Sequence, residues 1–274
     1  MGCLNDKGQF AHWFGNIHLS GPCNRSCYFC IGQHMMALDS QNNLAKIPDN
    51  LDRFLGLCWE KGVKEICLTG TNTDPLLYKR TRELTNYIKG KMDGTPLAIR
   101  TNGVAYNRMD FGCFDKASLT ICSFNEEINV KMMGGKGCDL PRILEENPLM
   151  DIKVNVVLGP ENAEKDVWHT LDCLAYHGVR RVNLREPYGQ PHVGNPFAKI
   201  GRIREKTVLG MPAYFWGGLE ATYWDVHYVE VESVNLYAQG RLSLTYPITQ
   251  GHDPDGKVFP QYMFPGGRIH EQWL

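Results

Sequence analysis

Short apolar runs alternate with amphipathic stretches through the first two thirds of the chain. We predict strands at residues 14–20, 65–69, 97–101, 119–124, 152–158 and 181–185, which are rich in Val, Ile, Leu and Phe. Segments with helical spacing of apolar residues separate most of these runs. Because strands and helices alternate, the pattern predicts parallel βα units arranged as an open sheet or a barrel.

Capping residues predict where the helices begin and end. Pro48 at a first helical position begins a helix that ends at Gly62. Asp74 as N-cap, followed by Pro75, begins a second helix that carries Leu84 and Ile88. A third helix follows the polar residues 125–127, and a fourth covers residues 163–176.

The alternation ends after Glu186, where Pro and Gly become frequent. An alternating stretch over residues 226–246 predicts a hairpin that turns at Gln239-Gly240. The sequence contains no internal repeat, low-complexity tract or linker. We therefore predict a single α/β domain over residues 1–274, with a core at about 14–190 and a β-rich C-terminal extension at about 191–274.

Three of the predicted strands carry polar residues on one face. Side chains alternate between the two faces of a strand, so these pairs share a face: Arg100 with Asn102, Lys153 with Asn155, and Asn183 with Arg185. Helices would cover the apolar faces. The interior of an ordinary barrel is filled by Val, Ile and Leu, so this pattern favours a polar binding lumen. The alternative is a set of edge strands with one face in water.

Composition narrows the class of protein. The chain has 274 residues, a net charge of −1 and a pI near 6.7, which excludes a strongly basic nucleic-acid-binding protein. Hydrophobic residues make up 43% of the chain, enough for a large core. We find neither a membrane-spanning apolar run nor a signal-peptide pattern, and we predict a soluble, cytoplasmic protein.

Cys23, Cys27 and Cys30 carry the strongest chemical signal, with three and then two residues between them. Three thiolates on one short loop can hold three irons of a [4Fe–4S] cluster and leave the fourth iron open to chemistry. The alternatives are a zinc site, buried structural cysteines, or a closed electron-transfer cluster with a distant fourth cysteine. Zinc usually needs four ligands in two tight pairs. The other cysteines are scattered, so no disulfide framework is predicted.

This loop resembles that of the radical S-adenosylmethionine (SAM) superfamily, in which an aromatic residue, here Phe29, precedes the last cysteine. The loop also follows the first predicted strand, as in that family. Residues 101–103, Thr-Asn-Gly, and residues 153–157, Lys-Val-Asn-Val-Val, resemble the branch with the molybdenum-cofactor cyclisation and deazaguanine-forming enzymes.

The resemblance implies a partial (βα)6 TIM-like barrel in which Cys23, Cys27 and Cys30 bind a [4Fe–4S] cluster. One electron from the cluster would cleave SAM, and the resulting 5′-deoxyadenosyl radical would remove a hydrogen atom from the substrate. The resemblance further implies SAM-binding roles for Phe29, Gly70, Thr71, Asn72, Asn102, Ser123, Asn125, Asn155 and Arg185. The alternative roles are loop packing for Phe29, a helix N-cap for Asn125, and structural contacts for Asn155 and Arg185.

The expected partners follow from the same reasoning. We expect a single-electron reductant such as a flavodoxin or ferredoxin, and a small polar or nucleotide-like substrate. The polar lumen favours such a molecule over a peptide or RNA, because a peptide needs a long groove or an exposed strand edge. The non-enzymatic alternative is an iron–sulfur sensor or electron carrier.

Overall fold

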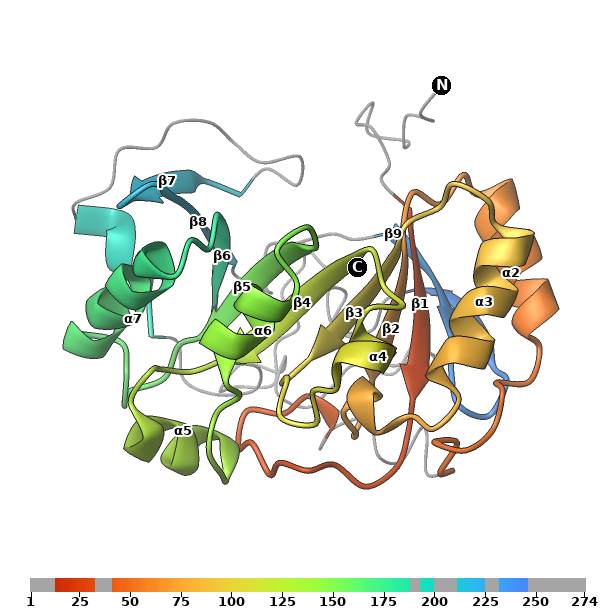
Figure 1. Cartoon of the computed structure of the whole chain (residues 1–274), viewed down its shortest axis with the longest axis horizontal. Helices are drawn as coiled ribbons and strands as arrows, with labels where there is room; N and C mark the ends of the chain where they lie inside the picture. The colour runs from red at the N-terminus through yellow and green to blue at the C-terminus, as the bar shows by residue number, and fades with distance from the viewer. Residues whose placement is uncertain (1–12, 33–40, 188–192, 200–210, 225–231, 246–274) are drawn as a thin grey trace, which may run out of the picture. The chain divides into compact units, whose positions relative to one another are not determined.

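The structure is a computed structural model that describes residues 13–32, 41–187, 193–199, 211–224 and 232–245. The chain forms two compact units. Figure 1 labels their helices and strands. Among the described residues, the first unit contains those up to Pro22, those of Ile31–Ala98 and those from Glu232 onward. The second contains Cys23–Cys30 and Ile99–Val229. Strand β3, Leu97–Thr101, crosses from the first unit into the second.

The first unit is built on a mainly parallel set of strands in the order β10-β9-β1-β2. These are β1 (Phe14–Leu19), β2 (Ile66–Gly70), β9 (Glu232–Leu236) and β10 (Leu242–Thr245). Strand β1 pairs in parallel with both β2 and β9, and β10 runs antiparallel to β9. Its helices are α2 (Leu51–Glu60) and α3 (Thr81–Lys91), with a short 3-10 helix η1 (Pro75–Leu77).

Side chains of α2 cover the outer face of this sheet. Phe54 and Cys58 are fully buried. A Cβ on Gly15 of β1 would lie 3.0 Å from the Cys58 sulfur and 3.1 Å from the Phe54 ring. Glycine at this position therefore lets the helix pack closely on the strand.

The other face of β1 carries a buried polar network. Asn235 of β9 accepts hydrogen bonds through Oδ1 from Asn16 Nδ2 at 3.1 Å and from His18 Nε2 at 3.2 Å. The His18 ring stacks on Tyr237, with the ring centres 4.7 Å apart. These contacts join two strands that lie more than 200 residues apart in the chain.

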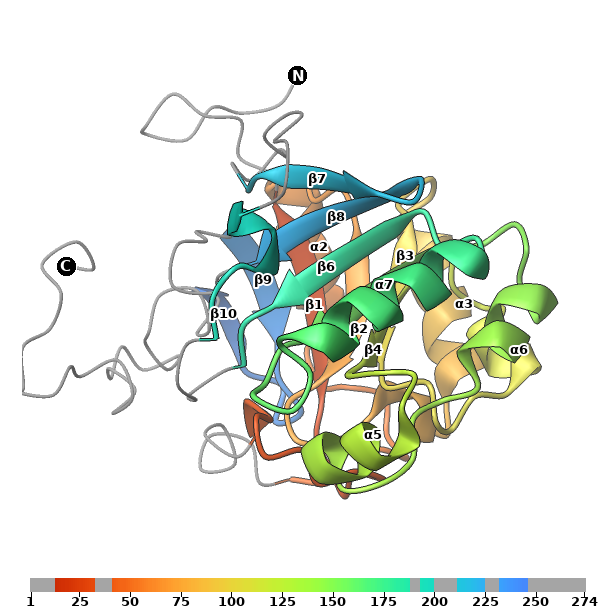
Figure 2. The same ribbon diagram turned by 90° about the vertical axis from the view of Figure 1, so that its left-hand side faces the viewer.

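The second unit contains strands in the order β4-β5-β6-β8-β7, and only β7 is antiparallel to its neighbour. The strands are β4 (Lys116–Ile121), β5 (Asp151–Val157), β6 (Arg181–Arg185), β7 (Ala213–Trp216) and β8 (Leu219–Trp224). The helices are α4 (Arg108–Phe111), α5 (Glu126–Met133), α6 (Leu140–Glu146) and α7 (Lys165–Tyr176), with a 3-10 helix η2 (Pro196–Lys199). Helix α7 contacts β7 and β8 (Figure 2).

The parallel βα units and the β-rich C-terminal extension confirm the predicted fold class. The hairpin is also confirmed, because β9 and β10 pair around Gly240, whose φ is 78°. Residues 226–231 and 246 of the predicted stretch lie outside the described residues. The single-domain assignment over residues 1–274 stays a prediction.

Three predicted boundaries were wrong. Helix α2 begins at Leu51 rather than at Pro48, after Asn50 takes a left-handed conformation. The helix predicted from Asp74 to Ile88 is two elements, because Tyr78 is extended and separates η1 from α3. Strand β4 covers Lys116–Ile121 instead of residues 119–124. None of the helices in the described parts of the chain is long and apolar enough to cross a lipid bilayer.

Candidate functional site

The segment that carries the three cysteines is held by the end of helix α5. Ser26 N donates to the carbonyl oxygen of Met133 at 3.0 Å, and Tyr28 N donates to that of Met132 at 3.3 Å. Gly134 ends the helix with a φ of 71°, and a Cβ there would lie 2.0 Å from Ser26 Oγ. The close approach of helix and loop therefore requires glycine at this position.

The other residues between the cysteines are also anchored. Asn24 Oδ1 accepts a hydrogen bond from Asn102 Nδ2 at 2.8 Å, and Arg25 Nε donates to the Lys136 carbonyl at 3.0 Å. Tyr28 Oη donates to Glu161 Oε2 at 3.0 Å. Residues that follow β3, α5 and β5 thus hold the loop in place.

The cysteine side chains differ in their surroundings. Cys23 is exposed, Cys27 and Cys30 are half-buried, and none of the three forms a disulfide. Cys27 packs with Phe29 against the buried residues Cys122 and Met132. Burial, and then repulsion from the Cys30 and Cys23 thiolates, raises the pKa of Cys27 to about 12. A bound cation would offset this repulsion, because metals bind the thiolate form.

These donors suit an iron–sulfur cluster by their chemistry. Soft thiolates are the usual ligands of such clusters, and the loop holds three of them on a fixed backbone. In the described residues, however, no group of three or more His, Cys, Asp or Glu side chains is arranged to hold a metal ion. The cluster therefore stays a proposal that rests on the donor set and on the anchored loop.

The end of β2 approaches the backbone of β1 closely. Thr71 donates to the Leu19 carbonyl through its backbone N at 2.8 Å and through Oγ1 at 3.1 Å. A Cβ on Gly70 would lie 1.8 Å from the Thr73 carbonyl oxygen, so only glycine fits there. Asn72 Oδ1 accepts hydrogen bonds from Ser20 Oγ at 2.9 Å and Gly21 N at 3.0 Å. The predicted SAM contacts Gly70, Thr71 and Asn72 therefore lie together.

Ser123 and Asn125 lie together at the start of α5. Ser123 Oγ donates to Asp166 Oδ1 at 2.9 Å and accepts from Asn125 N at 2.8 Å. Asn125 Oδ1 accepts from Glu127 N at 3.0 Å, which makes Asn125 the N-cap of α5, the alternative role considered for it. Their contact with SAM stays a prediction.

The polar strand faces predicted from the sequence form rows across the second unit. Thr120 pairs with Asn155, Asn155 with Asn183, and Asn183 with Thr222. Asn155 Nδ2 donates to Ser118 Oγ on β4 at 2.7 Å. The intervening residues of these strands, such as Leu119 and Val154, are apolar and fully buried.

Two more of the residues predicted to bind SAM, Arg185 and Asn102, contact other residues of the second unit. The Arg185 guanidinium lies 6.0 Å from the centre of the Trp224 ring. Asn102 uses both atoms of its side-chain amide, since Oδ1 accepts from Val104 N at 2.9 Å while Nδ2 holds Asn24. Roles for Asn102, Asn155 and Arg185 toward SAM stay predictions.

The sequence analysis missed two buried asparagines, Asn129 and Asn162, that bind the backbone at the ends of β4 and β5. Asn129 Oδ1 accepts from the backbone N atoms of Cys122 and Ser123, both at 3.2 Å. Asn162 Nδ2 donates to the carbonyls of Cys122 and Val157 at 2.7 and 2.8 Å. Only tertiary structure reveals these bonds, because no local sequence signal marks partners up to 40 residues away.

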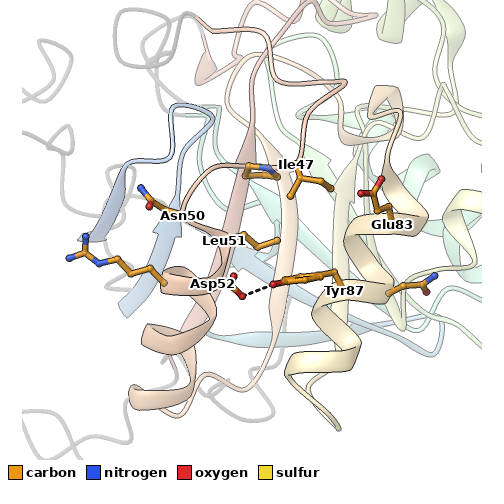
Figure 3. A pocket seen from close by; sticks show the side chains of 9 residues that line it. Ile47, Asn50, Leu51, Asp52, Glu83 and Tyr87 are labelled. Carbon is orange, nitrogen blue, oxygen red and sulfur yellow. Dashed lines mark hydrogen bonds between the residues drawn. The ribbon is translucent and has the colours of Figure 1, made fainter.

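A cavity of about 820 Å³ lies elsewhere, between α2 and α3 in the first unit (Figure 3). Tyr87 and Asp52 face each other across it, with a hydrogen bond of 2.6 Å between Tyr87 Oη and Asp52 Oδ1. Its lining residues contain no cysteine and none of the predicted SAM contacts. We assign this cavity no part in the chemistry.

Parts of this chain are similar to known proteins. No protein-family model matches the chain. A GTP 3′,8-cyclase of Campylobacter fetus subsp. fetus (strain 82-40) is 29% identical over 87 residues, which cover 32% of this chain and 26% of the cyclase.

The fold is similar to that of SuiB from Streptococcus suis. Its crystal structure matches with a TM-score of 0.52 and 16% identity, over 65% of this chain and 40% of SuiB. SuiB bound to its precursor peptide SuiA gives the same values. SuiB bound to S-adenosylmethionine gives a TM-score of 0.49 and 14% identity, over 65% of this chain and 39% of that one.

The match therefore covers about a quarter of the cyclase and two fifths of SuiB. These matches agree with the resemblance indicated by the cysteine loop, and the match to SuiB at 16% identity shows a shared fold.

Proposed function

We propose that the chain is a radical SAM enzyme whose Cys23, Cys27 and Cys30 hold a [4Fe–4S] cluster. The observation that carries the proposal is the anchored loop, in which the residues between the cysteines bond to α5, β3 and Glu161. When bound, a reduced cluster supplies the electron that cleaves SAM to a 5′-deoxyadenosyl radical, which takes a hydrogen atom from the substrate.

The protein's own residues bind and orient the reactants. Gly70 and Thr71 hold the end of β2 close to β1, where the methionine part of SAM would bind. Phe29 packs against the same buried cluster as Cys27 and would contact the adenine. Five further residues would contribute polar contacts to SAM or to the substrate: Asn102, Ser123, Asn125, Asn155 and Arg185.

The substrate we propose is a small polar or nucleotide-like molecule. The polar face of the second unit carries neutral amides and hydroxyls in its central row, at Asn155, Asn183 and Thr222. Lys153 and Arg185 lie on the same face of β5 and β6, so it also offers positive charge to an anionic group. A cytoplasmic single-electron reductant, a flavodoxin or ferredoxin, would complete the system.

A peptide substrate is the second candidate. The observation in its favour is the shared fold with SuiB, which has been crystallised with the peptide SuiA. Strand β7 lies at the end of the strand order in the second unit and is antiparallel to its neighbour, so an extended peptide has an edge on which to add.

The test is anaerobic reconstitution with iron and sulfide, followed by reductant and SAM. We expect about four irons per chain and release of 5′-deoxyadenosine. Cys27→Ala should abolish both the cluster absorbance and the cleavage of SAM. Cys173→Ala is the matched control, because Cys173 lies on α7 outside the loop and should leave both unchanged.

Two results would contradict the proposal. Retention of both signals in Cys27→Ala would remove the cluster assignment. A redox-active cluster that never releases 5′-deoxyadenosine would instead support the sensor or electron carrier. Stimulation of release by metabolite pools, but not by peptide pools, would favour the small-molecule substrate.

A further inference from the structure

Glu161 lies in a tight turn that follows strand β5 in the second unit. Asn162 closes this turn through two hydrogen bonds to Gly159. Its Oδ1 accepts from Gly159 N at 2.8 Å, and its backbone N donates to the Gly159 carbonyl at 3.1 Å. Its Nδ2 donates to the carbonyls of Cys122 and Val157, at the ends of β4 and β5. Asn162 is only 1% exposed, and its side chain therefore ties the turn that carries Glu161 to both strands.

The same turn packs closely against Tyr28 of the cysteine loop. Tyr28 Oη donates to Glu161 Oε2 at 3.0 Å, and Tyr28 N donates to the Met132 carbonyl at 3.3 Å. A Cβ on Gly159 would lie 2.5 Å from Tyr28 Oη and 2.9 Å from Glu161 Oε2. Glycine at this position therefore leaves the room that the hydroxyl needs to reach the carboxylate. Tyr28 is held both by its backbone and by the end of its side chain.

Tyr28 stands between Cys27 and Phe29, two residues with expected roles at the cluster and at SAM. The rings of Tyr28 and Phe29 meet edge to face, with their centres 5.5 Å apart and their planes at 83°. All three residues pack against the same buried cluster, which consists of Cys122, Met132, Met133 and Val157. Because Cys27 and Phe29 are joined to Tyr28 by peptide bonds, a displacement of Tyr28 would move both of them.

We propose that Glu161 is a positioning residue which, through the hydroxyl of Tyr28, sets the places of Cys27 and Phe29. The inference rests on the proposed function, because it concerns the cluster and the SAM that these two residues would bind. Glu161 acts here as a hydrogen-bond acceptor. A carboxamide oxygen accepts in the same way as a carboxylate oxygen, so glutamine should be able to replace Glu161 in this role.

Three variants test the proposal in protein that has been reconstituted with iron and sulfide and kept oxidised. Tyr28→Phe removes the hydroxyl but keeps the ring, Glu161→Ala removes the acceptor, and Glu161→Gln keeps it. Tyr28→Phe and Glu161→Ala should each release iron to a chelator faster than the parent protein. Equilibrium dialysis should show their Kd for SAM raised by about fivefold, the factor that one hydrogen bond typically supplies. Glu161→Gln should match the parent protein in both measurements.

Tyr106→Phe is the matched control, because it removes the same kind of bond elsewhere in the second unit. Tyr106 Oη donates to Glu146 Oε2 at 2.8 Å, outside the cysteine loop. We expect parental iron release and a parental Kd for SAM in this variant. Melting temperatures measure the loss of stability in all four variants. Tyr28→Phe and Tyr106→Phe should melt at similar temperatures, so a difference in iron release or in Kd cannot come from stability alone.

Three results would overturn the inference. Parental iron release and Kd in Tyr28→Phe would show that the hydroxyl does not position the loop. Equal losses in Glu161→Gln and Glu161→Ala would assign the effect to the negative charge, and equal losses in Tyr28→Phe and Tyr106→Phe would make it a general loss of stability. In each of these cases the parent protein still holds its cluster and binds SAM. If the parent protein does neither, the proposed function fails together with the inference.

Discussion

Tyr78 is a buried residue whose contribution to stability depends on pH. It is 2% exposed, and its hydroxyl donates to the Lys46 carbonyl at 2.8 Å. Burial raises its pKa above the usual value of a tyrosine, which is about 10. The folded protein therefore keeps this proton where the unfolded chain loses it, so the stabilisation is complete below about pH 10 and is lost as the pH rises further.

We predict that Tyr78→Phe lowers the free energy of unfolding by about 1 kcal/mol at pH 8, the usual net value of one hydrogen bond. The variant should also lose less stability than the parent protein above pH 10. Urea unfolding across this pH range measures both effects. Tyr176→Phe, at a residue that is 86% exposed, should change neither. An unchanged alkaline slope in Tyr78→Phe would contradict the prediction.

The roles of some residues could be predicted from the sequence, and the roles of others could not. The capping role of Asn125 follows from the polar residues before a helix, and Glu127 N does bond to its side chain. The partner of Ser123 is Asp166, 43 residues later, and no local pattern announces it. The three cysteines could be singled out from the sequence because they lie on one short segment. Asn102 and Glu161, which hold that segment, could not, since they come from distant elements.

Among the elements, the junction of α5 with the cysteine loop depends on Gly134. Gly134→Ala adds a methyl group that would lie 2.0 Å from Ser26 Oγ, and it also places alanine at a positive φ. Gly178→Ala shares the positive φ of 76° but has no atom within 4 Å of the new Cβ. Comparison of the two variants separates the cost of the positive φ from the cost of the close contact with Ser26 Oγ.

We predict that Gly178→Ala destabilises the protein by about 1–2 kcal/mol, the cost of the left-handed conformation. Gly134→Ala should lower the free energy of unfolding by more than this. The variant should also lose iron faster after reconstitution, because the added methyl group would shift the cysteine loop. Thermal melts and iron release to a chelator measure the two effects. Equal iron release from both variants would show that the contact with Ser26 does not position the loop.

The strands were easier to predict than the helices. Strand β6 matches its predicted residues 181–185 because an alternating apolar pattern in a short run leaves little choice of register. The prediction of one long helix from Asp74 was wrong, because Asp74 caps a short 3-10 helix instead. Its Oδ1 accepts a hydrogen bond from Leu76 N. The Tyr78 side chain then bonds to Lys46, a tertiary contact that overrides local helical preference.

At the scale of the molecule, the two units are interleaved along the chain. The chain passes between the units after Pro22, Cys30, Ala98 and Val229. A unit assembled from three separate stretches cannot fold before the last of them is present. We therefore predict a single cooperative unfolding transition, as expected of one domain.

Far-ultraviolet circular dichroism and tryptophan fluorescence, recorded on the same urea series, test this prediction. The described tryptophans include Trp59 in the first unit and Trp168 in the second, so fluorescence reports on both. Coincident midpoints would support one cooperative domain. Two separated transitions would instead show that the units unfold independently.

The pairing of β1 with β9 has a consequence for biosynthesis. Strand β1 is made first, yet Asn16 and His18 find their partner Asn235 only when almost the whole described chain has left the ribosome. Until then one edge of β1 stays open, and open edges invite pairing with other nascent chains. Slow translation or early termination before β9 should therefore favour aggregation, and a chaperone that shields β1 should raise the yield of active protein.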